Sequence, residues 1–124
     1  MKTQIINGKI YEEKDGNFVL VEIAQEDERG LEYVIVRTYS AGVFAGYLDH
    51  HEGQEVTLIN ARRLWQWFGA SSLSELAVHG TSEPTLCKFP VAVTKVQLLN
   101  AIEILEVTKK AQDSIENVPI WTQH

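Results

Sequence analysis

Residues 33–48 of the chain read YVIVRTYSAGVFAGYL, and this stretch decides the fold class. Side chains that are β-branched or aromatic dominate residues 31–39, which favours a strand over a helix. Residues 40–42 (SAG) interrupt the run, as expected of a bend or a β-bulge. Residues 43–48 form a second apolar run with Gly46 inside it. We therefore predict two consecutive strands, joined at residues 40–42.

Further strands are predicted on the C-terminal side of this stretch. Residues 49–53 (DHHEG) have the composition of a turn, and residues 54–59 continue with a strand. Apolar and polar side chains alternate over residues 89–98, and residues 101–107 also favour a strand. Residues 98–102 (LLNAI) fit a helix as well, which leaves the start of the last strand open.

A hairpin is predicted on the N-terminal side. Residues 9–14 and 17–24 flank Asp15 and Gly16, a pair suited to a tight turn with positive φ. The charged residues 25–30 (QEDERG) follow, with the composition of a solvated loop.

Two short helices complete the pattern. Ser72 and Glu75 make a capping box for a helix over residues 72–79, and a glycine follows at once. Thr108 is placed to cap a last helix, residues 109–116. A tail over residues 118–121 (VPIW) then packs back on the body.

These elements predict a mainly β fold (β-rich α+β), a small antiparallel barrel or sandwich with two short helices. A chain of 124 residues is the size of one domain, so we predict a single domain over residues 1–124. Within it, residues 1–30 form the N-terminal hairpin and charged loop. Residues 108–124 form the C-terminal helix and tail.

The overall composition limits the classes of function. A net charge of −6 argues against a broad surface for DNA or RNA, which would need many lysines and arginines. No apolar run approaches the length that crosses a bilayer, and the first residues lack the apolar stretch of a signal peptide. Cys87 is the only cysteine, so no internal disulfide can form. We expect a cytoplasmic protein that binds neither a membrane nor nucleic acid broadly.

No pattern in the sequence predicts catalysis or a cofactor. His50 and His51 are adjacent, and neighbours on a strand point to opposite faces, so they do not make a zinc-binding pair. Cys87 has no nucleophile motif around it and has the surroundings of a small buried residue. There is no glycine-rich phosphate loop before a helix. We therefore expect no enzyme activity, no catalytic residues, no metal and no cofactor.

The most informative segment is residues 61–67, ARRLWQW. Guanidinium groups bind phosphates and carboxylates, and indole rings stack on bases or anchor protein interfaces. On the strand over 31–39, an arginine and a tyrosine two residues apart share a face. The candidate site for a ligand or partner consists of Arg37, Tyr39, Arg62, Arg63, Trp65 and Trp67. The alternative is that the tryptophans are core or lid residues and the arginines bridge to carboxylates.

The two neighbouring arginines differ in role if residues 61–67 are extended rather than helical. Arg63, Trp65 and Trp67 then share one face, and Arg62 points to the opposite one. An inward guanidinium needs a carboxylate, several carbonyls or a bound anion, because burial without a partner is costly. We predict that Arg63 lies on the face that binds the ligand or partner. A helix over these residues would remove this assignment.

Three motifs resemble a family of short uncharacterised proteins encoded by tailed bacteriophages and prophages. They are RTYSAG (residues 37–42), ARRLWxWxGAxxL (residues 61–73) and AIEI (residues 101–104), and the likeness covers roughly residues 33–107. The resemblance implies a phage accessory protein that acts in the cytoplasm of the bacterial host. It supplies no catalytic residues.

Small acidic phage proteins without enzyme motifs often act by binding. We therefore expect a non-catalytic protein of counter-defence or host takeover, which sequesters a nucleotide-like small molecule or blocks a host defence protein. We also expect a homo-oligomer. The alternative function is a structural or assembly component of the phage particle.

Overall fold

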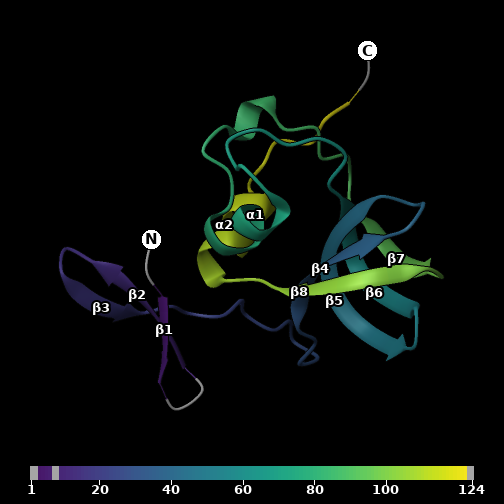
Figure 1. Cartoon of the computed structure of the whole chain (residues 1–124). Helices are drawn as coiled ribbons and strands as arrows, with labels where there is room; N and C mark the ends of the chain where they lie inside the picture. Colours follow the sequence, from purple (N-terminus) through teal and green to yellow (C-terminus); the bar gives the residue numbers. More distant parts are fainter. Residues whose placement is uncertain (1–2, 7–8, 123–124) are drawn as a thin grey trace.

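Two separate antiparallel sheets organise the chain. The computed structural model describes residues 3–6 and 9–122 (Figure 1). The N-terminal sheet has the order β1-β2-β3, with β1 (Thr3–Ile6), β2 (Lys9–Lys14) and β3 (Asn17–Leu20). The larger sheet has the order β7-β6-β5-β4-β8, with β4 (Tyr33–Thr38), β5 (Val43–Glu52), β6 (Glu55–Arg63), β7 (Val93–Leu98) and β8 (Ala101–Glu106). The helices are α1 (Leu73–His79), the short 3-10 helix η1 (Pro84–Leu86) and α2 (Lys109–Glu116).

The strand β4 is buried on both faces, which explains its unbroken apolar sequence. Tyr33 and Ile35 pack in the core that includes the helices, whereas Val34 and Val36 pack in a second core on the opposite face. A strand covered on one face only would alternate with polar residues. The strand predicted over residues 31–39 is confirmed.

The five-stranded sheet curls on itself. β7 pairs with β6 and β8 pairs with β4, so these consecutive strands lie at opposite edges of the sheet. Only Leu99 and Asn100 separate them in sequence, and Ala101 donates its backbone N–H to the Gln54 carbonyl across the gap. The edges therefore meet at one end without pairing along their length. The fold class predicted from the sequence is confirmed, in the form of a curled sheet rather than a closed barrel.

Two hydrophobic cores lie on the two faces of this sheet. The core beside the helices contains Leu64, Leu76, Phe89, Val107 and Ile115, among others. The core inside the curl comes from the strands and their turns alone, and it contains Val34, Val36, Phe44, Val56, Leu58, Ala61, Leu98 and Ala101.

The predicted turn at residues 49–53 is wrong in its extent. β5 continues through His50 and His51 to Glu52, and the chain reverses at Gly53 and Gln54. The strand gains this length because β5 bends, with irregular pairing near Gly46 and Asp49, and follows the curl of the sheet. The polar composition of residues 49–53 belongs to an exposed strand end, not to a loop.

Both predicted helix caps are confirmed. Ser72 Oγ accepts the Glu75 N–H, and the Glu75 carboxylate accepts the N–H of Ser71, one residue before the expected partner. Thr108 Oγ1 accepts the Ala111 N–H at the start of α2, and its hydroxyl donates to the Val78 carbonyl at the end of α1. One threonine thus caps a helix and joins it to its neighbour.

The N-terminal sheet connects to the helices through a firmly bonded linker. The predicted hairpin is confirmed as β2 and β3, although β3 ends at Leu20 rather than at residue 24, and β1 was not predicted. After β3, the Lys109 N–H donates to the Glu22 carbonyl, and the Ala24 N–H donates to the Val107 carbonyl. In Figure 1 the three strands lie apart from the larger sheet, beyond the helix pair. Among the described residues, no helix has the length and apolar character needed to span a membrane.

Candidate functional site

Arg62 lies inside the molecule and is bonded to main-chain carbonyls. It is 8% exposed. Its guanidinium donates to four carbonyl oxygens, those of Pro90 (3.0 Å), Ile115 (2.9 Å), Phe89 (2.9 Å) and Pro119 (3.1 Å). Burial lowers the pKa of the guanidinium. Arg62 therefore joins β6 to the segment before β7 and to the chain after α2.

Arg63 lies on the opposite face, as predicted for an extended segment. Its guanidinium carbon is 4.3 Å from the centre of the Phe44 ring, and Nη1 donates to the Ala41 carbonyl. Phe44 belongs to the core inside the curl, so Arg63 covers one end of that core from the solvent side.

Arg37 and Tyr39 stand near the β4–β5 turn. Arg37 Nε donates to Glu103 Oε1 on β8 at 3.0 Å, in an exposed ion pair. Tyr39 is 81% exposed, and its N–H donates to the Asn100 carbonyl at 3.0 Å. Asn100 Nδ2 in turn donates to Ser40 Oγ at 2.7 Å. The β7–β8 turn thus fixes the backbone that presents the Tyr39 ring to solvent.

The expected grouping of Trp65 and Trp67 is wrong. β6 ends at Arg63, and the Leu64 N–H donates to the Val43 carbonyl, after which the chain leaves the sheet. Trp67 packs against the core beside the helices, whereas Trp65 is 60% exposed. The strict alternation that placed them on one face does not apply beyond the end of a strand.

Trp65 belongs instead to a surface group with the half-buried Lys88 and Trp121, here called the tryptophan patch. The rings of Trp65 and Trp121 meet edge to face at 4.8 Å, and Lys88 Nζ lies 5.5 Å from the centre of the Trp121 ring. Backbone hydrogen bonds hold the three segments together. Gln66 and Lys88 each donate their N–H to the carbonyl of the other, and the Trp121 N–H donates to the Phe89 carbonyl. Exposed Phe68 and Leu86 lie on two of these segments.

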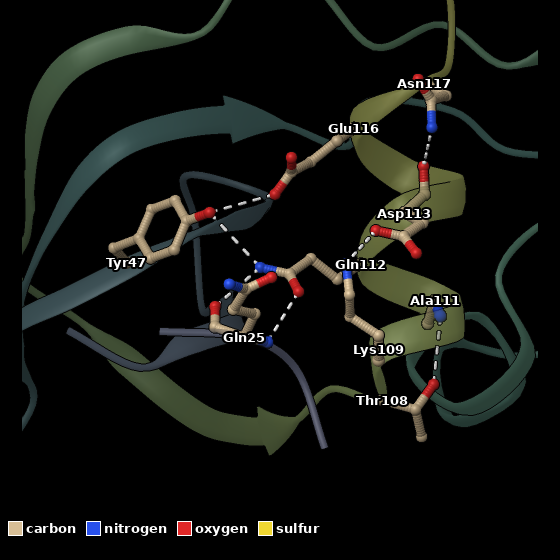
Figure 2. Close-up of polar contacts among 9 residues, drawn as sticks. All are labelled: Gln25, Tyr47, Thr108, Lys109, Ala111, Gln112, Asp113, Glu116 and Asn117. Atoms are coloured by element: carbon tan, nitrogen blue, oxygen red, sulfur yellow. Dashed lines mark hydrogen bonds and ion pairs between the residues drawn. The ribbon is translucent and has the colours of Figure 1, made fainter. Parts of the chain in front are cut away.

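A second polar group lies where the sheet meets α2, and the sequence analysis missed it. Tyr47 donates its hydroxyl hydrogen to Glu116 Oε1 at 3.1 Å and accepts a bond from Gln112 Nε2 at 3.3 Å (Figure 2). The Gln112 side chain also accepts a hydrogen bond from the Gln25 N–H and donates one to the Gln25 carbonyl. These two bonds connect the linker to α2. Burial, followed by the charge of Glu116, raises the pKa of Tyr47 to about 12.

Tyr33 packs beside Tyr47, with the ring centres 5.1 Å apart in an edge-to-face arrangement. Burial, then the charge of Glu116, raises the pKa of Tyr33 strongly. The pairing of the two tyrosines follows from the register of β4 and β5 around Ser40.

Cys87, His50 and His51 each contact groups in their own surroundings. Cys87 is buried, with Sγ near the Phe68 and Glu83 carbonyls, so the prediction of a small buried residue is confirmed. His50 lies 3.7 Å from Glu52, and His51 contacts the Gly53 carbonyl. Within residues 3–6 and 9–122, no three or more His, Cys, Asp or Glu side chains gather as a metal site.

Comparison with known proteins identifies a family. No curated protein and no solved structure matches the chain. One family model matches residues 31–115, more than half of the chain, and this range includes both cores apart from residues at their margins. The chain therefore belongs to the family described as a domain of unknown function, DUF6948.

Proposed function

We propose that this protein is a non-catalytic phage accessory protein that acts in the host cytoplasm by binding and blocking a host protein. The tryptophan patch carries the proposal. Tryptophan is among the residues enriched in the side chains that dominate the binding energy of protein interfaces, and adjoining apolar side chains at a surface mark interaction sites. Lys88 beside Trp121 adds a positive charge, which favours an acidic partner surface.

The version in which the protein sequesters a nucleotide-like molecule has less support. A phosphate site needs guanidinium groups that are free to bind it. Here Arg62 is bonded to four carbonyls, Arg37 pairs with Glu103, and Arg63 lies over Phe44. Each of these guanidinium groups therefore already contacts other groups of the protein.

The test is an affinity purification of the tagged protein from phage-infected cells, with mass spectrometry of what is retained. The variant is Trp65→Ala, and the matched control is Leu99→Ala, which removes an equally exposed apolar side chain from the β7–β8 turn. We expect one host protein to be retained by the wild type and by the control and lost with Trp65→Ala. With purified components, affinity should fall by about thirtyfold, as for a dominant interface residue.

Two results would contradict this proposal. One is the same set of retained proteins with Trp65→Ala as with the wild type. The other is many copies of the protein in purified phage particles, which would support the structural alternative. Light scattering tests the predicted homo-oligomer separately. A dimer that Trp65→Ala dissociates would assign the patch to self-association.

A further inference from the structure

A cavity of about 230 Å³ lies beside the two tyrosines. Here called the tyrosine cavity, it opens between the larger sheet and the chain after α2. Its lining consists of Tyr33, Tyr47, Asn60, Arg62, Ala92, Glu116, Val118 and Ile120. Polar groups occupy one part of this wall, and aliphatic side chains occupy the rest.

The Tyr33 hydroxyl is the strongest sign of a ligand. Tyr33 is only 3% exposed, and within the described residues no group bonds to its hydroxyl. Tyr33 lines this cavity and a second pocket of about 540 Å³, and its unpartnered hydroxyl retains some accessible surface. The charged groups that affect the pKa of this hydroxyl, Glu116 and Arg62, line the tyrosine cavity, which favours that side for the hydroxyl. A buried hydroxyl normally has a partner, and here the place for that partner is the cavity.

Two further donors face this space. Arg62 has five N–H groups, and carbonyls of the described chain accept four of them, which leaves one on Nη1. Asn60 has a side-chain amide with no bond to any described group, and it adopts a positive φ of 51° at an irregular point of the β5–β6 pairing. Non-glycine residues in this conformation tend to mark functional positions.

Glu116 provides a hydrogen-bond acceptor in the same cavity. Its carboxylate accepts one bond, from Tyr47, and no described lysine or arginine lies within ion-pairing distance of it. It can therefore accept a hydrogen bond from an amine or amide. The cavity thus offers donors from Tyr33 and Arg62 and an acceptor from Glu116.

We propose that the tyrosine cavity binds a small polar molecule that carries a hydrogen-bond acceptor and a hydrogen-bond donor. An α-amino acid zwitterion and a free nucleobase share this chemistry. The space is many times the roughly 15 Å³ that one water molecule needs, so it admits a small organic molecule. Val118, Ile120 and Ala92 provide the apolar wall.

A phosphate group on the ligand is disfavoured. A larger cleft of about 730 Å³ shares Tyr47 and Asn60 with the tyrosine cavity, and Glu26, Asp27 and Glu28 line it. Its one arginine, Arg29, is paired with Asp27. A ligand that extends into this cleft meets mostly negative charge, so a nucleobase should bind better than its nucleotide.

The experiment is a chemical-shift titration of the full-length, isotope-labelled protein with L-valine and, separately, with uracil. Two analogues of valine, here called the single-pole probes, carry only one of its two charged groups. They are 3-methylbutanoate, which is valine without its ammonium group, and 2-methylpropylamine, which is valine without its carboxylate. Uridine monophosphate tests the phosphate. The variants are Tyr33→Phe, which breaks no bond within the described chain, and Asn60→Gly, which tolerates the positive φ. Tyr39→Phe, at an exposed tyrosine outside the cavity, is the control.

We expect valine or uracil to bind with a dissociation constant on the order of 1 mM, the range for so small a ligand, with shifts at Tyr33, Tyr47 and Asn60. Tyr33→Phe and Asn60→Gly should each weaken binding about fivefold or more, and Tyr39→Phe should not. Binding of valine alone identifies an amino acid as the ligand, and binding of uracil alone identifies a nucleobase. The proposal fails if neither probe shifts these residues, if the single-pole probes bind as tightly as valine, or if Tyr33→Phe binds like the wild type.

Discussion

At the scale of single residues, Arg62 carries a positive charge into the interior without a carboxylate partner. Four carbonyls from two segments surround its guanidinium, and each would lose one hydrogen bond if the side chain were removed. The Phe89 and Ile115 carbonyls would keep a backbone donor, whereas the Pro90 and Pro119 carbonyls have no other donor among the described residues. A buried polar group left without a partner destabilises a fold more than the loss of an exposed contact does. Arg63, its neighbour, makes its contacts at the surface.

The two arginines therefore predict different losses of stability. Arg62→Ala should lower the free energy of unfolding by about 3 kcal/mol, whereas Arg63→Ala should lower it by about 1 kcal/mol or less. Urea unfolding followed by tryptophan fluorescence measures both. Equal losses for the two variants would show that the carbonyl contacts of Arg62 do not stabilise the fold.

Tyr47 predicts a loss of stability in alkali. In the unfolded chain a tyrosine releases its proton near pH 10, its ordinary pKa, whereas the folded protein raises the pKa of Tyr47 to about 12. Between these values the folded state binds more protons, so the contribution present below about pH 10 is lost as the pH rises toward 12. Urea unfolding at a series of alkaline pH values should show a shallower decline for Tyr47→Phe than for the wild type. Identical slopes would refute the assignment.

The sequence predicted the opposite orientations of Arg62 and Arg63 because strand periodicity alone determines them. It did not predict the partners of Arg62, since Pro90, Ile115 and Pro119 lie 28 or more residues away in sequence. The tyrosine cavity was not predicted for the same reason, because the residues that line it are far apart in the sequence. Glu116 and Tyr47 are 69 residues apart and meet only after α2 has packed on the sheet.

At the scale of elements, β5 and β6 pack closely at Gly46. A Cβ at this position would lie 2.9 Å from Cα of Ala61 and 3.1 Å from its Cβ. No side chain fits there unless the strands separate. The close approach allows β5 to bend and the sheet to curl, and the glycine inside the apolar run 43–48 signalled it.

Gly46→Ala should therefore destabilise the protein by about 2 kcal/mol or more, through overpacking between strands. The control is Gly30→Ala, in the loop before β4, where a Cβ would meet no atom within 4 Å. Its positive φ of 77° alone should cost about 1 kcal/mol. Thermal unfolding of the two variants makes the comparison. A smaller loss for Gly46→Ala than for Gly30→Ala would contradict the account of the curl.

Local signals predicted elements well when a few adjacent residues determine them. The helix caps at Ser72 and Thr108 and the turn at Asp15 and Gly16 are of this kind. The end of β5 was wrong because pairing with β6, rather than local composition, sets its length. β1 was missed although Asn7 and Gly8, which separate it from β2 in sequence, are a pair typical of a two-residue hairpin turn.

At the scale of the whole molecule, the N-terminal sheet is separable from the rest. The family match begins at residue 31, and the described members of both cores begin at Ala24. Strands β1 to β3 pair only with one another. The larger sheet and the helices therefore contain the contacts that stabilise the fold.

Removal of residues 1–20 should change the thermal midpoint by no more than about 4 °C, the shift that about 1 kcal/mol produces in a domain of this size. Removal of residues 117–124 should lower it much more, because Val118 leaves the core and Pro119 leaves Arg62. Circular dichroism on the two shortened chains gives the comparison. A collapse of the midpoint after the N-terminal deletion would assign a stabilising role to the first sheet.

The position of the Arg62 acceptors also affects how the chain folds as it is made. During translation, Arg62 on β6 is synthesised some fifty residues before Ile115 and Pro119, whose carbonyls it binds in the folded protein. Until then only the Pro90 and Phe89 carbonyls can accept hydrogen bonds from the guanidinium. Burial of the charged group is therefore unfavourable, and the guanidinium should remain hydrated. The nascent chain should thus keep the interior beside the helices open through most of its synthesis, and it should close that interior in one late step.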